Sequence, residues 1–358
     1  MAMMVPVKDA ARRWGLTERR VASLCMEGKI PGAQKQGHAW MMPLDAEKPV
    51  DRRVRTGAYR KASSPGARGG APVHPAYRMA ICYDFDKTLS PDDMQTFTLI
   101  PSFGVDQDEF WAESNKLAHE NLMDTNLAWM FELIKYSKFK DKSLKREYFN
   151  RIGADVKLFD GVDTWFSRTT EYAARKNIAL EHYIISSGLK EIIEGSPVAP
   201  YFTRVYASSY LYSPDGIAEW PAQAINYTSK TQYIFRIAKG ILNEYDERVN
   251  DSMPPEQLRI PYENIVYIGD SATDIPCMRL VKSKGGYSIG VYDPRKDNRA
   301  KVYQLYNDGR LNFYAPADYT EKGALFRYIQ EIMDEIAVRE RIRDERRQLR
   351  QHAGGHRK

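Results

Sequence analysis

Residues 79–88 read MAICYDFDKT. The first five form an apolar run that is typical of a buried strand, and the carboxylates of Asp84 and Asp86 follow it directly. Because side chains alternate along a strand, both carboxylates fall on one side where the chain leaves the sheet. In open parallel sheets, ligand sites form beyond the carboxyl ends of the strands. The stretch therefore predicts a buried strand that carries two acidic groups into a site.

Three further polar segments follow an apolar run or open a helical pattern. They are Ser186-Ser187-Gly188, Lys230 and Gly269-Asp270-Ser271-Ala272-Thr273-Asp274. Two carboxylates held near 4 Å repel by roughly 1–4 kcal/mol, and a divalent cation removes that penalty. Hard oxygen ligands of this kind suit Mg²⁺. Together, the four segments indicate a site that binds a divalent cation, grips a phosphate and attacks phosphorus with an aspartate.

Taken one at a time, the same residues have plainer explanations. An aspartate after a strand is commonly a turn or cap residue, and the final acidic pair could merely cap a helix. Lys230 alone is most often a surface lysine, and Ser186-Ser187-Gly188 alone is a generic turn between a strand and a helix. Of the two serines, Ser186 is preferred as the phosphate-binding hydroxyl because it directly follows the strand. The joint occurrence of all four segments favours catalysis.

Composition restricts the classes of protein to which the chain can belong. Its 358 residues are 43% hydrophobic, enough for more than one domain with a packed core, and no apolar run approaches the ~18 residues of a membrane span. The start of the chain lacks the layout of a signal peptide, and Cys25, Cys82 and Cys277 are isolated, without disulfide or metal-binding spacing. These features predict a cytoplasmic protein without membrane contact.

Charge and composition divide the chain. Residues 1–70 hold 14 Lys/Arg and 6 Asp/Glu, a net charge of +8. Since the whole chain has a net charge of +6, the remaining residues carry −2. The basic end favours a polyanionic partner for that end alone. Residues 54–76, rich in Gly, Pro, Ser and Ala, predict a flexible linker between a small domain at residues 1–53 and a body at residues 77–330. A charged C-terminal helix or tail is predicted at residues 331–358.

The small domain has helix and hairpin signals. Val7–Trp14 shows a short helical pattern, and Thr17 can cap a second helix that ends near Gly28. The spacing of Val21 and Leu24 places both on the inward face of that second helix. The segment that follows, GAQKQGHAWMMP, reads as a small hairpin. Helix, turn, helix and hairpin together predict a winged helix-turn-helix.

This pattern resembles the excisionase and mercury-resistance-regulator group of DNA-binding domains, over VKDAARRWGLTERRVASLCMEGKIPGAQKQGHAWMMP. The resemblance implies that Arg19 and Arg20 begin a recognition helix, that Lys35 and His38 lie on the wing, and that double-stranded DNA is a partner. The alternative is a solvated basic helix in a small protein-interaction module. One such unit binds weakly alone, so a homodimer or a second module would be needed for a specific site.

The body alternates strand and helix signals, which predicts an α/β fold with a doubly wound parallel sheet. Pro214-Asp215-Gly216 marks a hairpin turn. Residues 94–158 form a helical insertion, in which Leu127, Met130, Phe131 and Ile134 repeat at helical spacing. The polar and aromatic side chains of this insertion either face a substrate or form its own core, and the aromatics favour the core. The candidates for facing a substrate are Trp111, Asn115, Lys116, His119 and Trp129.

Over residues 79–300, the four segments in this order resemble the haloacid dehalogenase superfamily of aspartate-nucleophile hydrolases. The resemblance implies a Rossmann-like core with a helical C1-type cap at about residues 94–158. It also implies that Asp84 is the nucleophile that forms an aspartyl-phosphate. Asp86 is then the general acid/base, and Lys230 neutralises the nucleophile and the phosphoryl group. Because Asp86 is acidic, a phosphomonoesterase or phosphotransferase is favoured over other chemistry of the superfamily.

The resemblance also assigns binding roles. The phosphate is held by Thr88, Ser186, Ser187, Gly188 and Lys230, and Mg²⁺ is held by Asp84, Asp86, Asp270 and Asp274. Asp86 contributes to the metal through its backbone carbonyl, and Asp270 is favoured over Asp274 as a direct ligand. Asp274, one helical turn later, can instead order metal-bound waters or hold Lys230.

Three functional hypotheses remain open at this stage. The leading one is a Mg²⁺-dependent phosphomonoester hydrolase with a DNA-binding-like module at its N-terminus. The second is a DNA-binding transcriptional regulator whose large domain senses a phosphorylated ligand with little or no turnover. In the third, the phosphorylated end of a nucleic acid is the substrate, which an open basic channel would support. The alternating charges of the C-terminal stretch favour a solvated helix over a partner contact.

Overall fold

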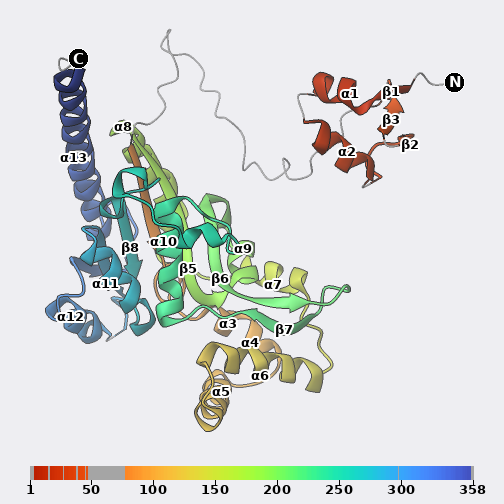
Figure 1. Cartoon of the computed structure of the whole chain (residues 1–358). Helices are drawn as coiled ribbons and strands as arrows, with labels where there is room; N and C mark the ends of the chain where they lie inside the picture. Colours follow the sequence, from red (N-terminus) through yellow and green to blue (C-terminus); the bar gives the residue numbers. More distant parts are fainter. Residues whose placement is uncertain are drawn as a thin grey trace. The chain divides into compact units, whose positions relative to one another are not determined.

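The described part of the chain falls into two units, each with its own hydrophobic core. In this computed structural model the units are Met1–Gly70 and Ala71–Lys358 (Figure 1). The predicted linker at residues 54–76 lies outside the described residues. The described residues are 4–14, 17–26, 28–37, 39–44, 46, 77–296 and 298–355.

The first unit combines two short helices with a three-stranded sheet of order β1-β3-β2. β3 pairs antiparallel with both neighbours, and the sequence pattern did not predict β1. Val21 and Leu24 are buried, as their spacing predicts. The elements are β1 (Met4–Pro6), α1 (Val7–Trp14), α2 (Glu18–Met26), β2 (Gln34–Gln36) and β3 (Ala39–Pro43).

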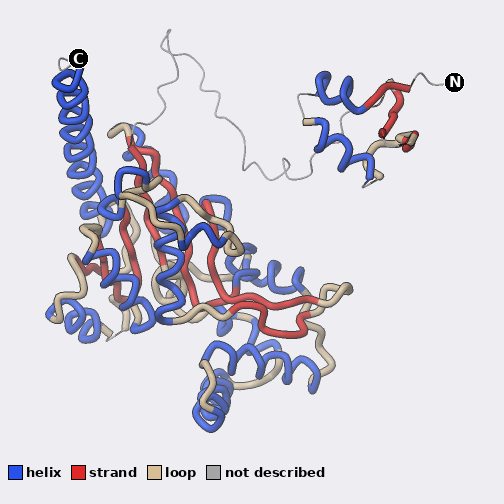
Figure 2. The backbone as a smooth tube through the Cα atoms, viewed as in Figure 1, coloured by secondary structure: helices blue, strands red, loops and turns tan. Residues whose placement is uncertain are grey.

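A seven-stranded sheet of order β10-β9-β8-β4-β5-β6-β7 forms the centre of the second unit (Figure 2). Neighbouring strands from β10 to β6 pair in parallel, and β7 runs antiparallel to β6 at the edge. The predicted parallel sheet is therefore present, and the predicted hairpin joins β6 to β7. The strands are β4 (Tyr77–Tyr83), β5 (Ile178–Leu189), β6 (Phe202–Tyr212), β7 (Ala218–Gln223), β8 (Ile265–Gly269), β9 (Tyr287–Tyr292) and β10 (Phe313–Pro316).

Helices cover both faces of this sheet. Alternate residues of β4 belong to different cores: Met79 and Ile81 pack with one, and Ala80 and Cys82 with the other. The first core receives α8 (Val162–Arg175), α9 (Lys190–Gly195) and α13 (Ala324–Gly355). The second core receives α10 (Thr231–Lys239), α11 (Ile275–Ser283) and α12 (Arg299–Asn307). Short 3-10 helices are η2 (Ala199–Tyr201), η3 (Tyr227–Lys230), η4 (Glu247–Asn250), η5 (Pro255–Gln257), η6 (Tyr262–Asn264) and η7 (Ala272–Asp274).

The predicted helical insertion contains five helices between β4 and α8. α5 packs on α6, α6 on β7, and α7 on α9 (Figure 1). The helical repeat predicted here lies in α6, where Met130 and Ile134 are buried, Leu127 is half-buried and Phe131 is 41% exposed. Trp129 and Leu133 complete the buried face instead. The helices are α3 (Met94–Phe97), α4 (Leu99–Ser102), α5 (Gln107–Asn121), α6 (Thr125–Phe139) and α7 (Arg146–Gly153).

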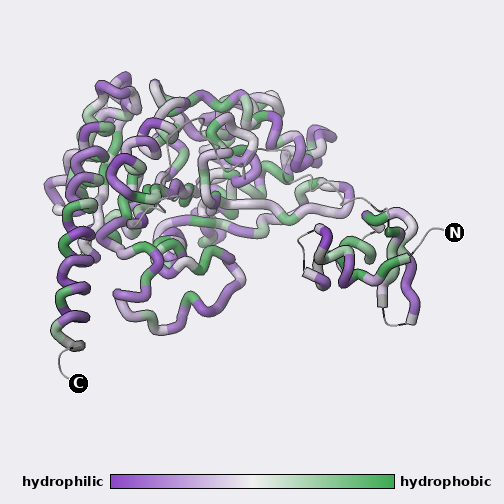
Figure 3. The backbone as a smooth tube through the Cα atoms, turned by 90° about the horizontal axis from the view of Figure 1, so that it is seen from above, coloured by the Kyte–Doolittle hydropathy of each residue, from purple (hydrophilic) through white to green (hydrophobic). Residues whose placement is uncertain are grey.

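α13 runs without a break through residue 330, where the sequence suggested a domain boundary. Its apolar side chains stay in the core as far as Ile336, and hydrophilic residues dominate the rest of the helix (Figure 3). No helix in the described ranges is long and apolar enough to cross a membrane.

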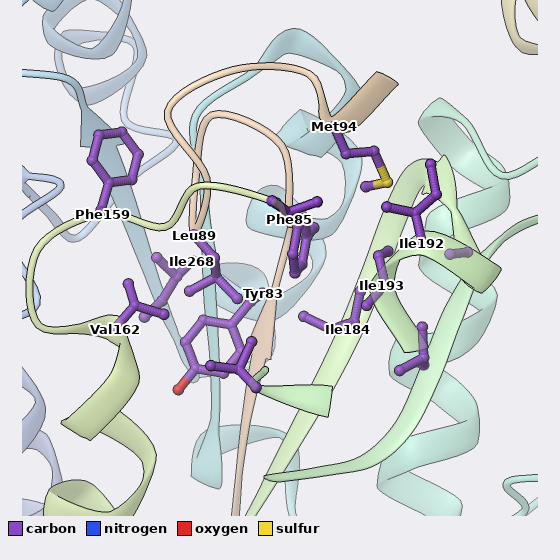
Figure 4. Close-up of a cluster of buried hydrophobic side chains, with 14 of the residues drawn as sticks. Tyr83, Phe85, Leu89, Met94, Phe159, Val162, Ile184, Ile192, Ile193 and Ile268 are labelled. Carbon is purple, nitrogen blue, oxygen red and sulfur yellow. The ribbon is translucent and has the colours of Figure 1, made fainter. Parts of the chain in front are cut away.

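A buried cluster fixes the loop that follows β4. Tyr83, Phe85 and Leu89 are fully buried, and Figure 4 shows them beside Ile184 of β5 and Ile268 of β8. The backbone N–H groups of residues 88, 89 and 90 all donate to the carbonyl of Phe85, at 3.3, 2.8 and 3.1 Å. The loop is therefore tight, and its buried side chains fix it to the core. The aspartates on either side of Phe85 are held in place as a result.

Candidate active site

Three aspartate carboxylates meet at the carboxyl ends of β4 and β8. Asp84 follows β4, Asp270 follows β8, and the N–H of Asp84 donates to the carbonyl of Ile268 at 3.0 Å. Asp274 ends η7, one turn further on. Each of the three offers a carboxylate oxygen, and these oxygens lie within 4.8 Å of one another. Segments that are 186 residues apart in the sequence thus meet at one point, as the strand positions predict.

Lys230 forms ion pairs with two of these three carboxylates. Its side chain is fully buried, and its Nζ lies 2.7 Å from Oδ1 of Asp274 and 3.2 Å from Oδ2 of Asp84. Burial works to lower the pKa of Lys230, but the charges of Asp274 and Asp84 raise it above its ordinary value. The lysine is therefore a fixed positive charge beside Asp84. Its position depends on Asn226, which caps η3 and accepts from the N–H of Tyr227 at 3.1 Å.

Both carboxylate oxygens of Asp274 accept hydrogen bonds. Its Oδ1 accepts from Lys230 and from the hydroxyl of Tyr267 at 2.8 Å, and its Oδ2 accepts from the N–H and the hydroxyl of Ser271, both at 3.0 Å. A Cβ on Gly269 would lie 2.6 Å from that Oδ2, so the close approach requires glycine. Burial alone would raise the pKa of Asp274, but Lys230 and these donors hold it below its ordinary value. Asp274 therefore suits the holding of Lys230 better than direct ligation of a metal.

Asp270 has the opposite character. Its one hydrogen bond among the described side chains comes from the hydroxyl of Thr88, at 3.3 Å, and no described cation forms an ion pair with it. Burial, together with the charges of Asp274 and Asp84, raises its pKa well above the ordinary value. Burial raises the pKa of Asp84 to about 6, with the charge of Asp274 adding to the effect and Lys230 opposing it. A cation held between Asp84 and Asp270 would relieve this repulsion, so the donor set fits a hard divalent ion.

Asp86 lies apart from the three clustered carboxylates. Its Oδ1 accepts from the N–H of Met94 at 2.8 Å, and a Cβ on Gly188 would lie 2.8 Å from its Oδ2. Burial and the charges of Asp93 and Asp84 raise its pKa well above the ordinary value. The side chain of Asp86 is therefore no member of the metal cluster, and the expected metal contact through its backbone carbonyl stays a prediction.

Of the expected phosphate-binding hydroxyls, that of Thr88 differs from the prediction. Thr88 is fully buried and its hydroxyl donates to Asp270, so in this geometry it orients a carboxylate instead of facing a substrate. Ser186 is also fully buried, and its Oγ accepts from the N–H of Gly188 at 3.1 Å. The Oγ of Ser187 is buried without a hydrogen-bond partner among the described residues.

Two cavities open onto these residues and share part of their walls. The aspartate cavity, of about 200 Å³, is lined by Asp84, Asp86, Ser186 and Asp270 among others. The tryptophan cavity, of about 440 Å³, is lined by Trp111 and Trp129 from the helical insertion. Both cavities are lined by Asp86, Lys87, Asp93, Thr125, Asn126 and Ser187.

Sequence reasoning found only part of these walls. Trp111 and Trp129 pack with the hydrophobic core, as favoured for the aromatics, and they also line the tryptophan cavity together with Asn115. Lys116 and His119 are exposed and line neither cavity. The lining residues outside the four predicted segments and the suggested insertion residues are Asp93, Gln95, Ser114, Thr125, Asn126 and Asn226. Of these, Asn226 had a signal in the sequence, because Asn226-Tyr-Thr-Ser229 is a capping box just before Lys230. The others depend on how the insertion packs over the sheet.

The residues suggested for DNA contact are described only in part. Arg19 and Arg20 lie in the first turn of α2, but their side chains lie outside the described residues. Lys35 is exposed on β2, and His38 falls outside the described residues.

Three solved structures share a similar chain path at low identity. One is a phospho-aspartyl intermediate analogue of phosphoserine phosphatase, at 16% identity and a TM-score of 0.43 over 71% of this chain and 99% of that chain. Another is a haloacid dehalogenase family hydrolase from Salmonella enterica, at 16% and 0.43 over 77% and 86%. A third is a probable phosphoserine phosphatase from Vibrio cholerae, at 12% and 0.46 over 75% and 69%. At identities this low, the substrates of these three proteins are not assigned to this chain.

Sequence comparison is more direct. A protein of Borreliella burgdorferi described as uncharacterized is 27% identical over 278 residues, which are 71% of this chain and 95% of that protein. The profile of the haloacid dehalogenase-like hydrolases matches residues 81–279, more than half of the chain. That continuous match runs from the first aspartate motif to the last, and the chain belongs to the haloacid dehalogenase-like hydrolases.

Proposed function

We propose that the chain is a Mg²⁺-dependent phosphomonoester hydrolase that works through an aspartyl-phosphate on Asp84. The observation that carries this proposal is the position of Asp84, whose carboxylate lies 3.2 Å from the buried Lys230 and lines the same cavity as Asp86 and Ser186. A nucleophile, a proton-transferring group and a phosphate-binding hydroxyl thus share one small space. Catalysis of phosphoryl transfer depends mainly on such positioning and on neutralisation of the phosphoryl charge.

In the first step, a carboxylate oxygen of Asp84 attacks phosphorus and the bond from phosphorus to the leaving alcohol oxygen breaks. Asp86 lines both cavities, so it lies where a phosphate in the aspartate cavity joins an alcohol in the tryptophan cavity. Its carboxyl proton passes to the departing oxygen. Lys230 offsets the negative charge on Asp84 and on the phosphoryl oxygens, while Asp274 keeps the ammonium in place.

In the second step, water attacks phosphorus and the bond between phosphorus and Asp84 breaks. Asp86, now ionised, accepts the proton of the attacking water, which restores both carboxyl groups and releases inorganic phosphate. Asp84 and Asp270 would hold the Mg²⁺, which supplies a second positive charge for the phosphoryl oxygens. Thr88 orients Asp270 for that contact through its 3.3 Å hydrogen bond.

Hydrolysis of p-nitrophenyl phosphate by the full chain tests this proposal. We expect turnover with Mg²⁺, loss of turnover on chelation with EDTA, and recovery when Mg²⁺ is restored. Asp84→Asn should lower kcat by at least about 10³-fold, because an amide cannot act as the nucleophile. Asp215→Asn, in the exposed β6–β7 turn, is the matched control and should leave kcat unchanged. An Asp84→Asn protein within tenfold of the wild-type rate would contradict the assignment.

Two rival functions give different results in the same assay. A sensor without turnover would bind phosphorylated ligands but hydrolyse none of them. An enzyme for nucleic-acid ends would need a basic channel, yet of the described residues that line the tryptophan cavity only Lys87 carries a positive charge. That lining supports a small-molecule leaving group.

For the first unit, we propose contact with double-stranded DNA through the start of α2. The arrangement that supports it is a pair of helices beside a three-stranded sheet, with Arg19 and Arg20 in the first turn of α2 and Lys35 exposed on β2. Fluorescence anisotropy of the full chain with duplex DNA is the test. Affinity should fall at least about tenfold between 50 and 200 mM salt, and fall further when Arg19→Ala and Arg20→Ala are combined.

The control for that test is the pair Lys138→Ala and Lys140→Ala on the second unit, which should leave DNA affinity unchanged. Binding that is absent, insensitive to salt or unaffected by the arginine substitutions would contradict the proposal.

A further inference from the structure

The tryptophan cavity lies where a leaving group would sit. Its walls come from α3, α5 and α6 of the helical insertion and from Ser187 and Gly188 at the end of β5. Asp86 marks its junction with the aspartate cavity. At about 440 Å³, it falls within the roughly 300–1,000 Å³ that small-molecule sites occupy. The chemistry of its walls therefore selects the alcohol that departs from the phosphate.

Unpartnered polar atoms are the first feature of these walls. Gln95 is 2% exposed and Ser114 is 1% exposed, yet Oε1 of Gln95 and Oγ of Ser114 have no hydrogen-bond partner among the described residues. The same holds for Oγ of Ser187. Buried polar atoms are nearly always paired, because an unpaired one costs free energy. All three oxygen atoms are covered in the folded protein, but their side chains line the cavity, so a bound molecule with hydroxyl groups would supply the missing partners once these side chains turn toward it.

The charge of the cavity is the second feature. Lys87 is the single described cation in its lining, and its Nζ is already paired with Oδ2 of Asp93 at 2.7 Å. A carboxylate on the leaving group would find no free positive charge, and it would meet the carboxyl groups of Asp86 and Asp93. Burying an unpaired charge is costly, so the walls act against acidic leaving groups.

Two indole rings are the third feature. Trp111 and Trp129 meet edge to face, with ring centroids 6.4 Å apart and planes at 73°. Both line the cavity. Aromatic walls beside a few neutral hydrogen-bonding groups suit a molecule with C–H faces and hydroxyl edges.

We infer that the tryptophan cavity selects phosphate monoesters of uncharged, polyhydroxylated alcohols, such as sugars or polyols. Gln95, Ser114 and Ser187 recognise the hydroxyl groups, and the two indoles pack against the carbon skeleton. This inference rests on the proposed phosphatase function and specifies the substrate class of the same site. It also excludes phosphoserine as the preferred substrate, since that compound carries a carboxylate.

Steady-state kinetics on a panel of monoesters test the selection. The panel contains glucose 6-phosphate, sorbitol 6-phosphate, phosphoserine, phosphocholine and p-nitrophenyl phosphate. We expect kcat/KM for at least one of the two hydroxylated substrates to exceed the values for phosphoserine and phosphocholine by at least about tenfold. A preference for phosphoserine or phosphocholine, or equal values across the panel, would overturn the selection.

Binding to Asp84→Asn separates this inference from the proposed function, because it requires no turnover. Calorimetric titration should show tighter binding of the sugar or polyol phosphate than of phosphoserine. Selective binding without hydrolysis of any ester by the wild-type protein would support the selection while removing the phosphatase. Hydrolysis of p-nitrophenyl phosphate without selective binding would do the reverse.

Two substitutions test the named side chains. Gln95→Leu and Ser114→Ala should each lower the ratio of kcat/KM for the preferred hydroxylated substrate to kcat/KM for p-nitrophenyl phosphate, by about tenfold for Gln95→Leu. Gln107→Leu and Ser143→Ala, at exposed positions in the same insertion, are matched controls and should leave the ratio unchanged. An unchanged ratio in Ser114→Ala, the milder change, would remove that serine from recognition even if Gln95→Leu failed to fold.

Discussion

The two cavities differ in whether their buried polar groups already have hydrogen-bond partners. Around the aspartate cavity, Lys230 contacts both Asp84 and Asp274, and every oxygen of Asp274 accepts at least two hydrogen bonds. Around the tryptophan cavity, atoms of Gln95 and Ser114 are buried without partners among the described residues. The network of Lys230 and Asp274 is complete as folded, whereas the walls of the tryptophan cavity still offer hydrogen bonds.

This difference separates chemistry from selection. Charges that act on a transition state are most effective when they are already held in place, because no reorganisation is then needed during the reaction. Groups that recognise a leaving alcohol contribute only when that alcohol satisfies them, and an alcohol without hydroxyl groups leaves them unpaired. The contrast predicts that substitutions in the two regions change stability in opposite directions.

The largest change is expected at Lys230. Lys230→Met leaves Asp84 and Asp274 buried without their cation, and breaking a buried ion pair from one side typically costs about 3–5 kcal/mol. The free energy of unfolding, measured by urea denaturation at pH 7 without Mg²⁺, should fall by that amount. Lys138→Met on the exposed side of α6 should change it by less than about 0.5 kcal/mol. A loss below about 1 kcal/mol at Lys230 would mean that the ion pairs are not essential to the folded region.

A second test concerns the polar network behind β4. His182 is buried, and its Nδ1 lies 3.0 Å from the hydroxyl of Tyr83, which also accepts from Nε1 of Trp165 at 2.8 Å. Burial lowers the pKa of His182 to about 3. Below about pH 6.5 the unfolded chain therefore binds a proton that the folded chain does not, and stability falls by about 1.4 kcal/mol per pH unit from this group.

Between pH 7 and pH 5, the wild-type protein should thus lose about 2 kcal/mol more stability than His182→Gln. Urea denaturation of both proteins at the two pH values measures this difference. If wild type and His182→Gln lost the same stability between pH 7 and pH 5, His182 would be accepting a proton in the folded protein. Burial would then not be holding it neutral.

The smallest effect has the opposite sign. Ser114→Ala removes a buried hydroxyl that has no partner among the described residues, so the free energy of unfolding should rise by up to about 1 kcal/mol in the absence of substrate. Ser288→Ala is the matched comparison, because Oγ of Ser288 is equally buried but donates to the carbonyl of Met278 at 2.6 Å. That substitution should lower stability by about 1 kcal/mol. If both serines destabilised equally when removed, the contrast between the two cavities would be lost.

The aspartate cavity could be predicted from the sequence because its residues are tied to strand ends. Asp84 and Asp270 each come directly after a strand, and neighbouring parallel strands bring such positions together whatever covers the sheet. Lys230 and Asp274 begin or end short helical turns beside those strands, so their places follow with little freedom.

The tryptophan cavity could not be predicted in the same way. Gln95 and Ser114 lie on helices of the insertion, and helical periodicity gives a buried face without saying what it covers. Phe131 illustrates the difficulty, since it shares a helical repeat with Met130 and Ile134 but tertiary packing leaves it 41% exposed while Leu133 is buried. Thr88 lies in the first motif, but the direction of its hydroxyl toward Asp270 follows from the folded structure and not from the motif.

A crystal structure of the protein with Mg²⁺ and beryllium fluoride, a mimic of a phosphoryl group on a carboxylate, would test the proposed chemistry most directly. We expect the beryllium on a carboxylate oxygen of Asp84 and the Mg²⁺ between Asp84 and Asp270, with Lys230 still in contact with Asp84. Beryllium on another carboxylate, or a Mg²⁺ that avoids Asp270, would contradict the account.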